Sequence, residues 1–115
     1  MIKDTNQTEV IFRKYRDGEI IALFPYMPEM QRATCLSYMK IGQHGVADLH
    51  LIGATKPVDS DEYQDLFIEL ENKGYKLKVI KRMSWKKYNR VYLGLNMLKT
   101  RSVKEHIRSM YNLSK

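Results

Sequence analysis

Two runs of mainly apolar residues near the N-terminus predict the first elements of the fold. Residues 9–15 (Glu-Val-Ile-Phe-Arg-Lys-Tyr) and 19–24 (Glu-Ile-Ile-Ala-Leu-Phe) are rich in β-branched and aromatic side chains, which favour strands. Asp17-Gly18 lies between them, and this pair is typical of a tight hairpin turn because glycine accepts a positive φ angle. The sequence therefore opens with a predicted β-hairpin.

The next stretch mixes strand signals with signals that interrupt strands. Pro25 and Pro28 cannot donate a backbone hydrogen bond, so the second strand is predicted to end there and residues 27–32 to form a loop. Residues 34–39 predict a third strand. Residues 40–58 contain several glycines and a proline and are predicted to be mostly irregular, with room for a short edge strand where apolar and polar residues alternate around Ala47.

A helix is predicted to follow. Asp59 and Glu62 have the spacing of a capping box, in which two side chains bond the first free N–H groups of a helix. The residues with the spacing of one buried helix face are Tyr63, Leu66, Phe67 and Leu70. Gly74 predicts the end of the helix in a left-handed conformation, with Tyr75 packed back on the last turn.

The remaining elements complete the expected architecture. Residues 76–83 predict a strand with Leu77 and Val79 inward. Trp85, Tyr88, Tyr92 and Leu95 have the spacing of a helix face, whereas Val91-Tyr92-Leu93 could also form a strand and Gly94 weakens both predictions; we favour the helix. A second capping-box pattern, Ser102 with Glu105, begins an amphipathic stripe. We expect an α+β fold in which a small antiparallel sheet, the N-terminal hairpin plus further strands, is covered by helices. Residues 1–8 are expected to be a flexible N-terminus, and residues 9–115 one domain with a basic, mainly helical region at 84–115.

Composition limits the class of protein. The chain has 115 residues, of which 43% are hydrophobic and 29% charged, and this is typical of one folded domain. Cys35 is the only cysteine, which excludes an intrachain disulfide and a cysteine-rich zinc site. No apolar run reaches the roughly 18 residues of a membrane span, and no signal-peptide pattern follows Met1. We expect a cytoplasmic protein without a membrane partner.

Charge divides the chain into two unequal parts. Residues 1–70 contain 7 Lys and Arg against 11 Asp and Glu, whereas residues 71–115 contain 13 against 2. The net charges of the two parts are therefore −4 and +11, within the total of +7. Such a division indicates either an acidic partner for the C-terminal part or a fold that brings the two parts together.

The densest positive charge lies between residues 76 and 90, where aromatic side chains are interleaved with it. Mixed lysines, arginines and aromatic rings can hold phosphates and stack bases. The candidate nucleic-acid-binding residues are Lys76, Lys78, Lys81, Arg82, Trp85, Lys86, Lys87 and Arg90. The alternative is that the aromatic residues belong to the core and the cations form a solvated surface, in part paired with the acidic helix.

A second candidate lies in Ile41-Gly42-Gln43-His44-Gly45. The two glycines can shape a tight turn that exposes backbone N–H groups and presents Gln43 and His44 to a ligand. In the alternative interpretation the turn is structural, and these two side chains close it with hydrogen bonds to the backbone. We favour the structural interpretation and keep Gln43 and His44 as candidate ligand-binding residues.

Catalytic and metal sites receive weaker support. Cys35 and His44 can be arranged as nucleophile and base with Asp48 orienting the imidazole, but no thiol-enzyme signature surrounds Cys35, which we expect to be buried and slow to react. His44, Asp48 and His50 are possible zinc ligands with no established spacing. The chain has neither a phosphate-binding glycine loop of the Walker type nor a dinucleotide fingerprint. We therefore assign no catalytic residue, no metal and no cofactor.

Several short motifs carry a resemblance to known proteins. They are Ala22-Leu23-Phe24-Pro25, Cys35-Leu36-Ser37-Tyr38, Ile41-Gly42-Gln43-His44-Gly45, Glu62-Tyr63, Glu69-Leu70 and Gly74-Tyr75. Over residues 9–82 the chain resembles a group of short uncharacterised bacterial proteins, some of them carried by phages or other mobile elements. The resemblance implies one compact domain in a bacterial cytoplasm, and it implies no activity, cofactor or catalytic residue.

These observations favour a nonenzymatic binding protein that associates with nucleic acid through residues 76–90. The rival is a protein-interaction module or homo-oligomer, whose amphipathic helices bury their apolar stripes against a partner protein or a second copy. An enzyme that uses the Gly-Gln-His-Gly segment comes third.

Overall fold

The N-terminal hairpin is present in the computed structural model, which describes residues 7–40 and 42–95. Strands β1 (Thr8–Lys14) and β2 (Ile20–Pro28) pair antiparallel. In the turn, Gly18 has a φ of +90°, and the N–H of Glu19 donates to Oδ1 of Asp17 at 2.9 Å. The positive φ that Gly18 accepts thus makes the predicted turn.

Strand β2 runs further than the sequence predicts. Pro25 and Pro28 were expected to end it after Phe24, yet β2 continues to Pro28, which lies opposite Cys35 of the next strand. The register between these strands shifts between Phe24 and Pro28, as at a β-bulge. A bulge leaves backbone groups out of the ladder, so it accommodates prolines that have no N–H to contribute.

A second hairpin follows. Strand β3 (Thr34–Met39) confirms the predicted third strand, and β4 (Gln43–Asp48) pairs with it antiparallel. Gly42, at a φ of +86°, lies in the turn between them. The prediction that residues 40–58 are mostly irregular is wrong, because β4 is a regular strand there and is followed by α1 (Leu51–Ala54) and β5 (Lys56–Pro57). Pairing with β3 gives order that the local glycines do not predict.

The sheet has the strand order β4-β3-β2-β1-β5, and β6 (Leu77–Val79) also pairs with β1. All pairs are antiparallel except β6 with β1, which is parallel. Strand β6 is shorter than the predicted strand at 76–83. Leu77 packs against the core as expected, whereas Val79 is 38% exposed rather than inward.

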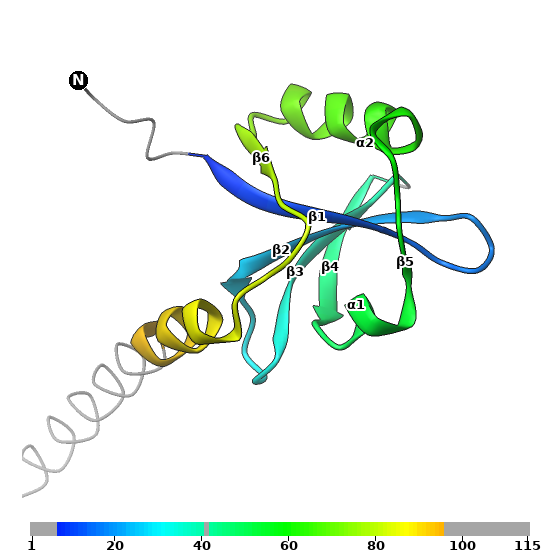
Figure 1. Cartoon of the computed structure of the whole chain (residues 1–115). Coiled ribbons are helices and arrows are strands. Elements are labelled where there is room, and N and C mark those ends of the chain that lie inside the picture. The colour runs from blue at the N-terminus through cyan, green and yellow to red at the C-terminus, as the bar shows by residue number, and fades with distance from the viewer. Residues whose placement is uncertain (1–6, 41, 96–115) are drawn as a thin grey trace, which may run out of the picture.

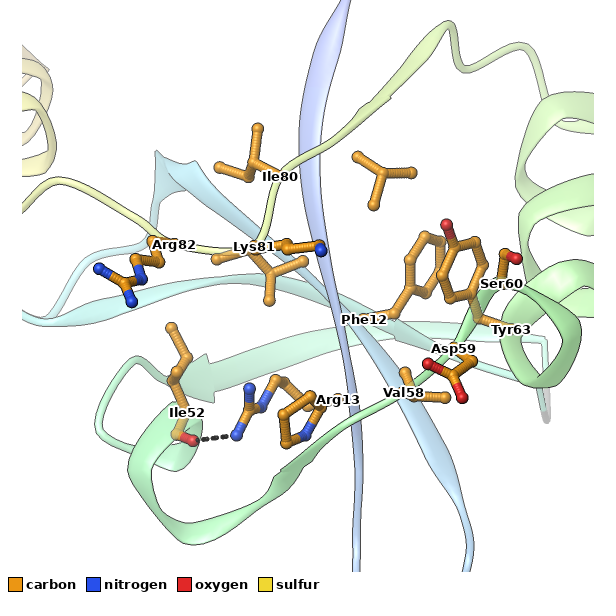
Figure 2. Close-up of a pocket in the computed structure, with 13 residues that line it drawn as sticks. Phe12, Arg13, Ile52, Val58, Asp59, Ser60, Tyr63, Ile80, Lys81 and Arg82 are labelled. Carbon is orange, nitrogen blue, oxygen red and sulfur yellow. Dashed lines mark hydrogen bonds between the residues drawn. The ribbon is translucent and has the colours of Figure 1, made fainter.

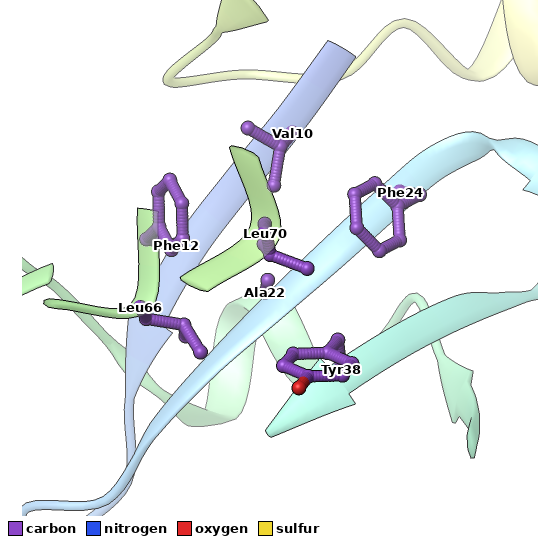
Figure 3. Packing of buried hydrophobic residues seen from close by; sticks show 7 residues of the cluster. All are labelled: Val10, Phe12, Ala22, Phe24, Tyr38, Leu66 and Leu70. Carbon is purple, nitrogen blue, oxygen red and sulfur yellow. The ribbon is translucent and has the colours of Figure 1, made fainter. Parts of the chain in front are cut away.

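Helix α2 (Ser60–Asn72) covers one side of the sheet (Figure 1). The predicted apolar face is confirmed, because Leu66 and Leu70 are buried and Tyr63 and Phe67 pack beside them. The cluster that they join with the sheet comprises Val10, Phe12, Ala22, Phe24 and Tyr38 (Figure 3). These are even-numbered positions, which share one face of the strands.

The two ends of α2 differ in how well the sequence predicts them. At the C-terminal end, Gly74 has a φ of +106°, and the N–H groups of Gly74 and Tyr75 donate to the carbonyls of Glu71 and Leu70. This is the predicted glycine-terminated helix end. The predicted capping box is present only in part: Asp59 makes no side-chain capping bond, whereas Glu62 interacts with the backbone of Asp59 as well as accepting a bond from Lys14 of β1.

The opposite side of the sheet is covered by α1 and by the start of a helix at residues 85–95 (Figure 1). Tyr88 of that helix is fully buried, and its hydroxyl donates to the carbonyl of Thr34 at 2.9 Å. The residues buried on this side are all odd-numbered: the sheet residues Ile11, Ile21, Leu23, Cys35 and Ala47, and Leu49 in the turn after β4. Both faces of the sheet are therefore buried, and the predicted α+β fold, a small antiparallel sheet with helices, is confirmed.

Part of the prediction falls outside the described residues. The helix expected to begin at Ser102 and Glu105 lies there, as do residues 1–6 of the expected flexible N-terminus. The helix predicted from Trp85 onward is confirmed over residues 85–95.

Candidate functional site

Gln43 and His44 lie in a strand rather than in a turn. Both belong to β4, where Gln43 is opposite Met39 and His44 is opposite Tyr38. Only Gly42 of the two flanking glycines has a positive φ, while Gly45 is paired with Ser37 in the ladder. The exposed N–H groups of a turn, on which the ligand-binding interpretation depended, are thus largely replaced by strand pairing.

His44 bonds another side chain. Its Nε2 lies 2.7 Å from the Tyr75 hydroxyl, and its ring meets the Tyr38 ring edge-on with centroids 4.9 Å apart. Tyr75 follows α2 and stacks on Phe24 at 5.0 Å. His44 therefore links the edge strand β4 to the segment that ends α2, by side-chain contacts rather than the backbone bonds that the structural interpretation expected.

Tyr38 connects His44 to α2, because its ring contacts His44 and its hydroxyl contacts Glu69 of that helix. The buried Tyr38 hydroxyl donates to the Glu69 carboxylate, and this bond raises the pKa of Tyr38 to about 12, with burial adding to the effect. Lys73 lies over the Tyr38 ring at 5.4 Å. An open groove lies outside this group, lined by His44, Lys73, Gly74 and Tyr75. The contacts indicate a role for His44 in holding the fold together.

Cys35 and His44 point to opposite sides of the sheet. Cys35 is opposite Ala47 and lies in the cluster beneath Tyr88, whereas His44 is opposite Tyr38 on the α2 side. Cys35 is fully buried, as expected, and burial raises the pKa of its thiol to about 12. A thiol with that pKa is protonated at neutral pH and is a poor nucleophile.

The zinc alternative also lacks a suitable arrangement. Asp48 accepts a hydrogen bond from the backbone N–H of His50 and lies 2.8 Å from its Nδ1, and this backbone bond lowers the pKa of Asp48. His44 bonds Tyr75 instead. Within residues 7–40 and 42–95, no three side chains of His, Cys, Asp or Glu are grouped closely enough to hold a metal ion.

The eight candidate residues for nucleic-acid binding divide into three groups. Lys87 belongs to the body of the protein, because its Nζ lies 2.8 Å from the Glu9 carboxylate and 4.3 Å from the centre of the Tyr26 ring. Lys76 is exposed and has an interaction of its own. The third group consists of Trp85 and the five remaining cations.

Those five cations form what we call the basic surface: Lys78, Lys81, Arg82, Lys86 and Arg90. All are exposed, and within the described part of the chain none takes part in a hydrogen bond or ion pair. Lys86 and Arg90 are four residues apart in the helix at 85–95 and so lie on one helix face. Lys81 and Arg82 lie in the segment between β6 and that helix and border a cavity beside β1.

Trp85 lies between Arg82 and Lys86 in the sequence and is 42% exposed. Its ring meets the Tyr88 ring edge-on at 5.6 Å and lies 5.6 Å from the His50 ring. These contacts hold the indole in place while leaving much of it accessible. The other rings of the basic region are engaged, because Tyr75 stacks on Phe24 and Tyr88 is buried. Trp85 is thus the exposed aromatic residue next to the unpaired cations.

Sequence reasoning missed the cavity itself. Its lining comes from β1, α1, the start of α2 and the segment after β6, which are distant in sequence. Arg13 is part of it, held by hydrogen bonds to Thr55 Oγ1 at 3.0 Å and to the carbonyls of Ile52 and Thr55. A lone arginine in a strand gives no pattern, so no local signal could have indicated this arrangement.

Comparisons with protein-family models, with curated proteins and with solved structures find no match to this chain. Across residues 7–40 and 42–95, no helix is both long enough and apolar enough to cross a membrane.

Proposed function

We propose that this protein is a nonenzymatic nucleic-acid-binding module that holds phosphates through the basic surface. The observation that carries the proposal is that five exposed cations within residues 78–90 have no partner in the described chain. Unpaired cations repel one another and leave a positive field, which a polyanion neutralises with release of its counterions. The buried thiol of Cys35 supports a reducing, cytoplasmic location as part of the same proposal.

Trp85 supports a preference for single strands. A half-exposed indole can stack on an unpaired base while a lysine of the basic surface neutralises a phosphate. Bases inside a duplex are already stacked and offer no free face to such a ring. Three of the five cations in the basic surface are lysines, which act as point charges and favour phosphate contacts over base-specific bidentate contacts, so sequence preference should be weak.

The proposal is tested by fluorescence anisotropy with labelled single-stranded and duplex oligonucleotides at two salt concentrations. We expect binding at low salt, tighter for the single strand, with the logarithm of affinity falling linearly with the logarithm of salt. Trp85→Leu should reduce the single-strand preference, since stacking contributes roughly 1–3 kcal/mol per base. Absence of binding at low salt, where attraction is strongest, would overturn the proposal.

A homo-oligomer is a second candidate, and it is favoured by one feature of the sheet. Strand β4 is the last strand of the order and, within the described residues, pairs on one edge only. Val46 in this strand is 62% exposed. An unpaired edge without a protecting lysine can pair with the same edge of a second copy. A mass measurement in solution tests it: a dimer that Val46→Lys converts to a monomer would support this candidate, and a monomeric wild type would exclude it.

A further inference from the structure

A gap in strand pairing lies along the outer edge of β1. On this edge Thr8–Val10 pair with β6 and Arg13–Lys14 pair with β5. Between them, Ile11 and Phe12 pair with β2 on the inner edge but have no strand partner on the outer edge among the described residues. The N–H of Ile80 donates to the carbonyl of Val10 at 2.9 Å, and beyond it the chain leaves the sheet. A cavity of about 730 Å³ fills the space that this divergence opens (Figure 2).

The walls of the cavity are mainly apolar. Apolar lining side chains include Phe12, Ile52, Val58, Tyr63, Val79 and Ile80. The rings of Phe12 and Tyr63 are stacked on each other at 4.2 Å, and Figure 2 shows them together at the end of the cavity near the start of α2. A volume of this size and a lining of this kind are typical of pockets that enclose a small organic molecule.

Positive charge lies away from these rings. Lys81 and Arg82 extend from the segment after β6 in different directions: Figure 2 shows the Lys81 side chain reaching over β1 and Arg82 far across the cavity from Asp59. Neither Lys81 nor Arg82 has a partner within the described chain. The guanidinium of Arg13 adds a third cation that its bonds to Thr55 and the Ile52 carbonyl hold in the wall. Asp59 is the one carboxylate among the lining residues, so cations outnumber it.

We propose that this cavity binds a small organic anion whose apolar body lies along Phe12, Tyr63 and Ile80 and whose carboxylate or phosphate group lies at Lys81. The site goes beyond nucleic-acid binding, because the apolar side chains at one end of the cavity offer a phosphate backbone neither positive charge nor hydrogen bonds. An apolar body gains by leaving water, and the charged group gains a charge-assisted hydrogen bond from the otherwise unpaired ammonium of Lys81.

The first test is a titration of the full chain with anilinonaphthalene sulfonate, an aromatic anion whose fluorescence rises when it leaves water. We expect saturable binding of one probe molecule, displaced by octanoate. Octanol and octylammonium have the same chain without the negative charge, and both should displace the probe at least roughly tenfold less effectively, the effect of one lost charge-assisted bond. No saturable binding, or equal displacement by octanol, would overturn the proposal.

Variants separate the two ends of the cavity. Val79→Trp places an indole into the cavity from a partly exposed strand position, and it should abolish probe binding while oligonucleotide binding persists. Lys81→Ala with Arg82→Ala should remove the advantage of octanoate over octanol. Arg16→Ala with Lys56→Ala removes two exposed cations that neither line the cavity nor belong to the basic surface, and this charge-matched control should leave the octanoate advantage unchanged. Circular dichroism and the denaturation midpoint establish that each variant is folded.

The outcomes also distinguish this site from the proposed function. Lys86→Ala with Arg90→Ala should weaken oligonucleotide binding and leave probe binding unchanged, because neither residue lines the cavity. Probe binding that survives Val79→Trp would contradict the site. If Val79→Trp does not fold, the double variant of Lys81 and Arg82 still tests the proposal. An undiminished advantage of octanoate over octanol in that variant would show that the anion binds elsewhere.

Discussion

The α2 side and the segment from β6 to residue 95 differ in whether their cations form ion pairs. On the α2 side the cations meet carboxylates: Lys14 lies 2.5 Å from Glu62, and Lys40 lies 3.5 Å from Asp65. In the other region only Lys87 has an ion pair, with Glu9, among the described cations of residues 78–90. Cations are thus neutralised by nearby carboxylates in the first region and remain mostly unpaired in the second.

This difference shows why charge density in the sequence is an incomplete guide to function. Exposed ion pairs contribute little stability, typically 0–1 kcal/mol, but they cancel the field that a distant ligand would encounter. The cluster of acidic residues on α2 could have paired with the basic segment, as one interpretation of the sequence expected. Within the described chain it pairs instead with Lys14 and Lys40, and the basic surface keeps its charge.

The strongest effect is expected where the basic region is anchored to the sheet. Tyr88 is fully buried and bonds the Thr34 carbonyl, so Tyr88→Ala removes both a large core side chain and a hydrogen bond. We expect a loss of about 3–5 kcal/mol in the free energy of unfolding. Tyr88→Phe should cost about 1 kcal/mol. Urea denaturation measures both, and equal effects of the two variants would contradict a packing role for the ring.

Arg13 gives the next largest effect. It binds Thr55 and the carbonyl of Ile52, which would lose their partner in Arg13→Ala, and the expected cost is about 2 kcal/mol. Arg13→Lys should recover little, because an ammonium cannot reproduce the planar fork. Arg16→Ala, in the exposed β1–β2 turn, is the control and should be close to neutral. Full recovery by lysine would show that charge alone is required.

His44 tests whether the α2 side is structural. His44→Ala and Tyr75→Phe each remove the 2.7 Å contact between Nε2 and the tyrosine hydroxyl, and each should cost about 0.5–1 kcal/mol because the contact is exposed. The double variant should cost less than the two single costs together, since both remove one interaction. Strict additivity in urea denaturation would mean that the contact does not stabilise the protein. Loss of a ligand response without loss of stability would instead favour a binding role.

The last expected effect is confined to alkaline pH, where stability should depend on the ionisation of Tyr38. Because Tyr38 donates to Glu69, its pKa is raised from about 10 to about 12, so the folded protein favours the neutral phenol. That contribution is complete below pH 10 and is lost as the pH rises from 10 to 12. The denaturation midpoint of the wild type should therefore fall more steeply over this window than that of Tyr38→Phe. Parallel curves would contradict the role of the Tyr38–Glu69 bond.

Local patterns predicted most of the elements. Gly18 and Gly74 have the positive φ angles expected of a hairpin turn and a helix end, and Leu66 and Leu70 face the core as their spacing indicates. Such features depend on residues near one another in the chain. Lys87 shows the opposite case, because its partner Glu9 is distant in sequence and no spacing rule could pair them.

Tertiary pairing accounts for the errors. Strand β4 forms in a glycine-containing stretch because β3 lies beside it, and β2 passes Pro25 because a bulge accommodates it. The candidate turn around Gln43 becomes a strand for the same reason. The cavity depends on β6 and β5 approaching one edge of β1 from opposite ends, an arrangement that only the folded chain shows.

The central claim is that binding follows the local basic surface rather than the total charge, and two charge-matched variants test it directly. Lys86→Ala with Arg90→Ala and Lys14→Ala with Lys40→Ala each remove two cations from the net charge of +7. Anisotropy with a labelled single strand across salt concentrations should show weaker binding and a salt slope flattened by roughly 1.4 for the first pair, and almost no change for the second. Equal weakening by both pairs, or none by the first, would contradict the claim.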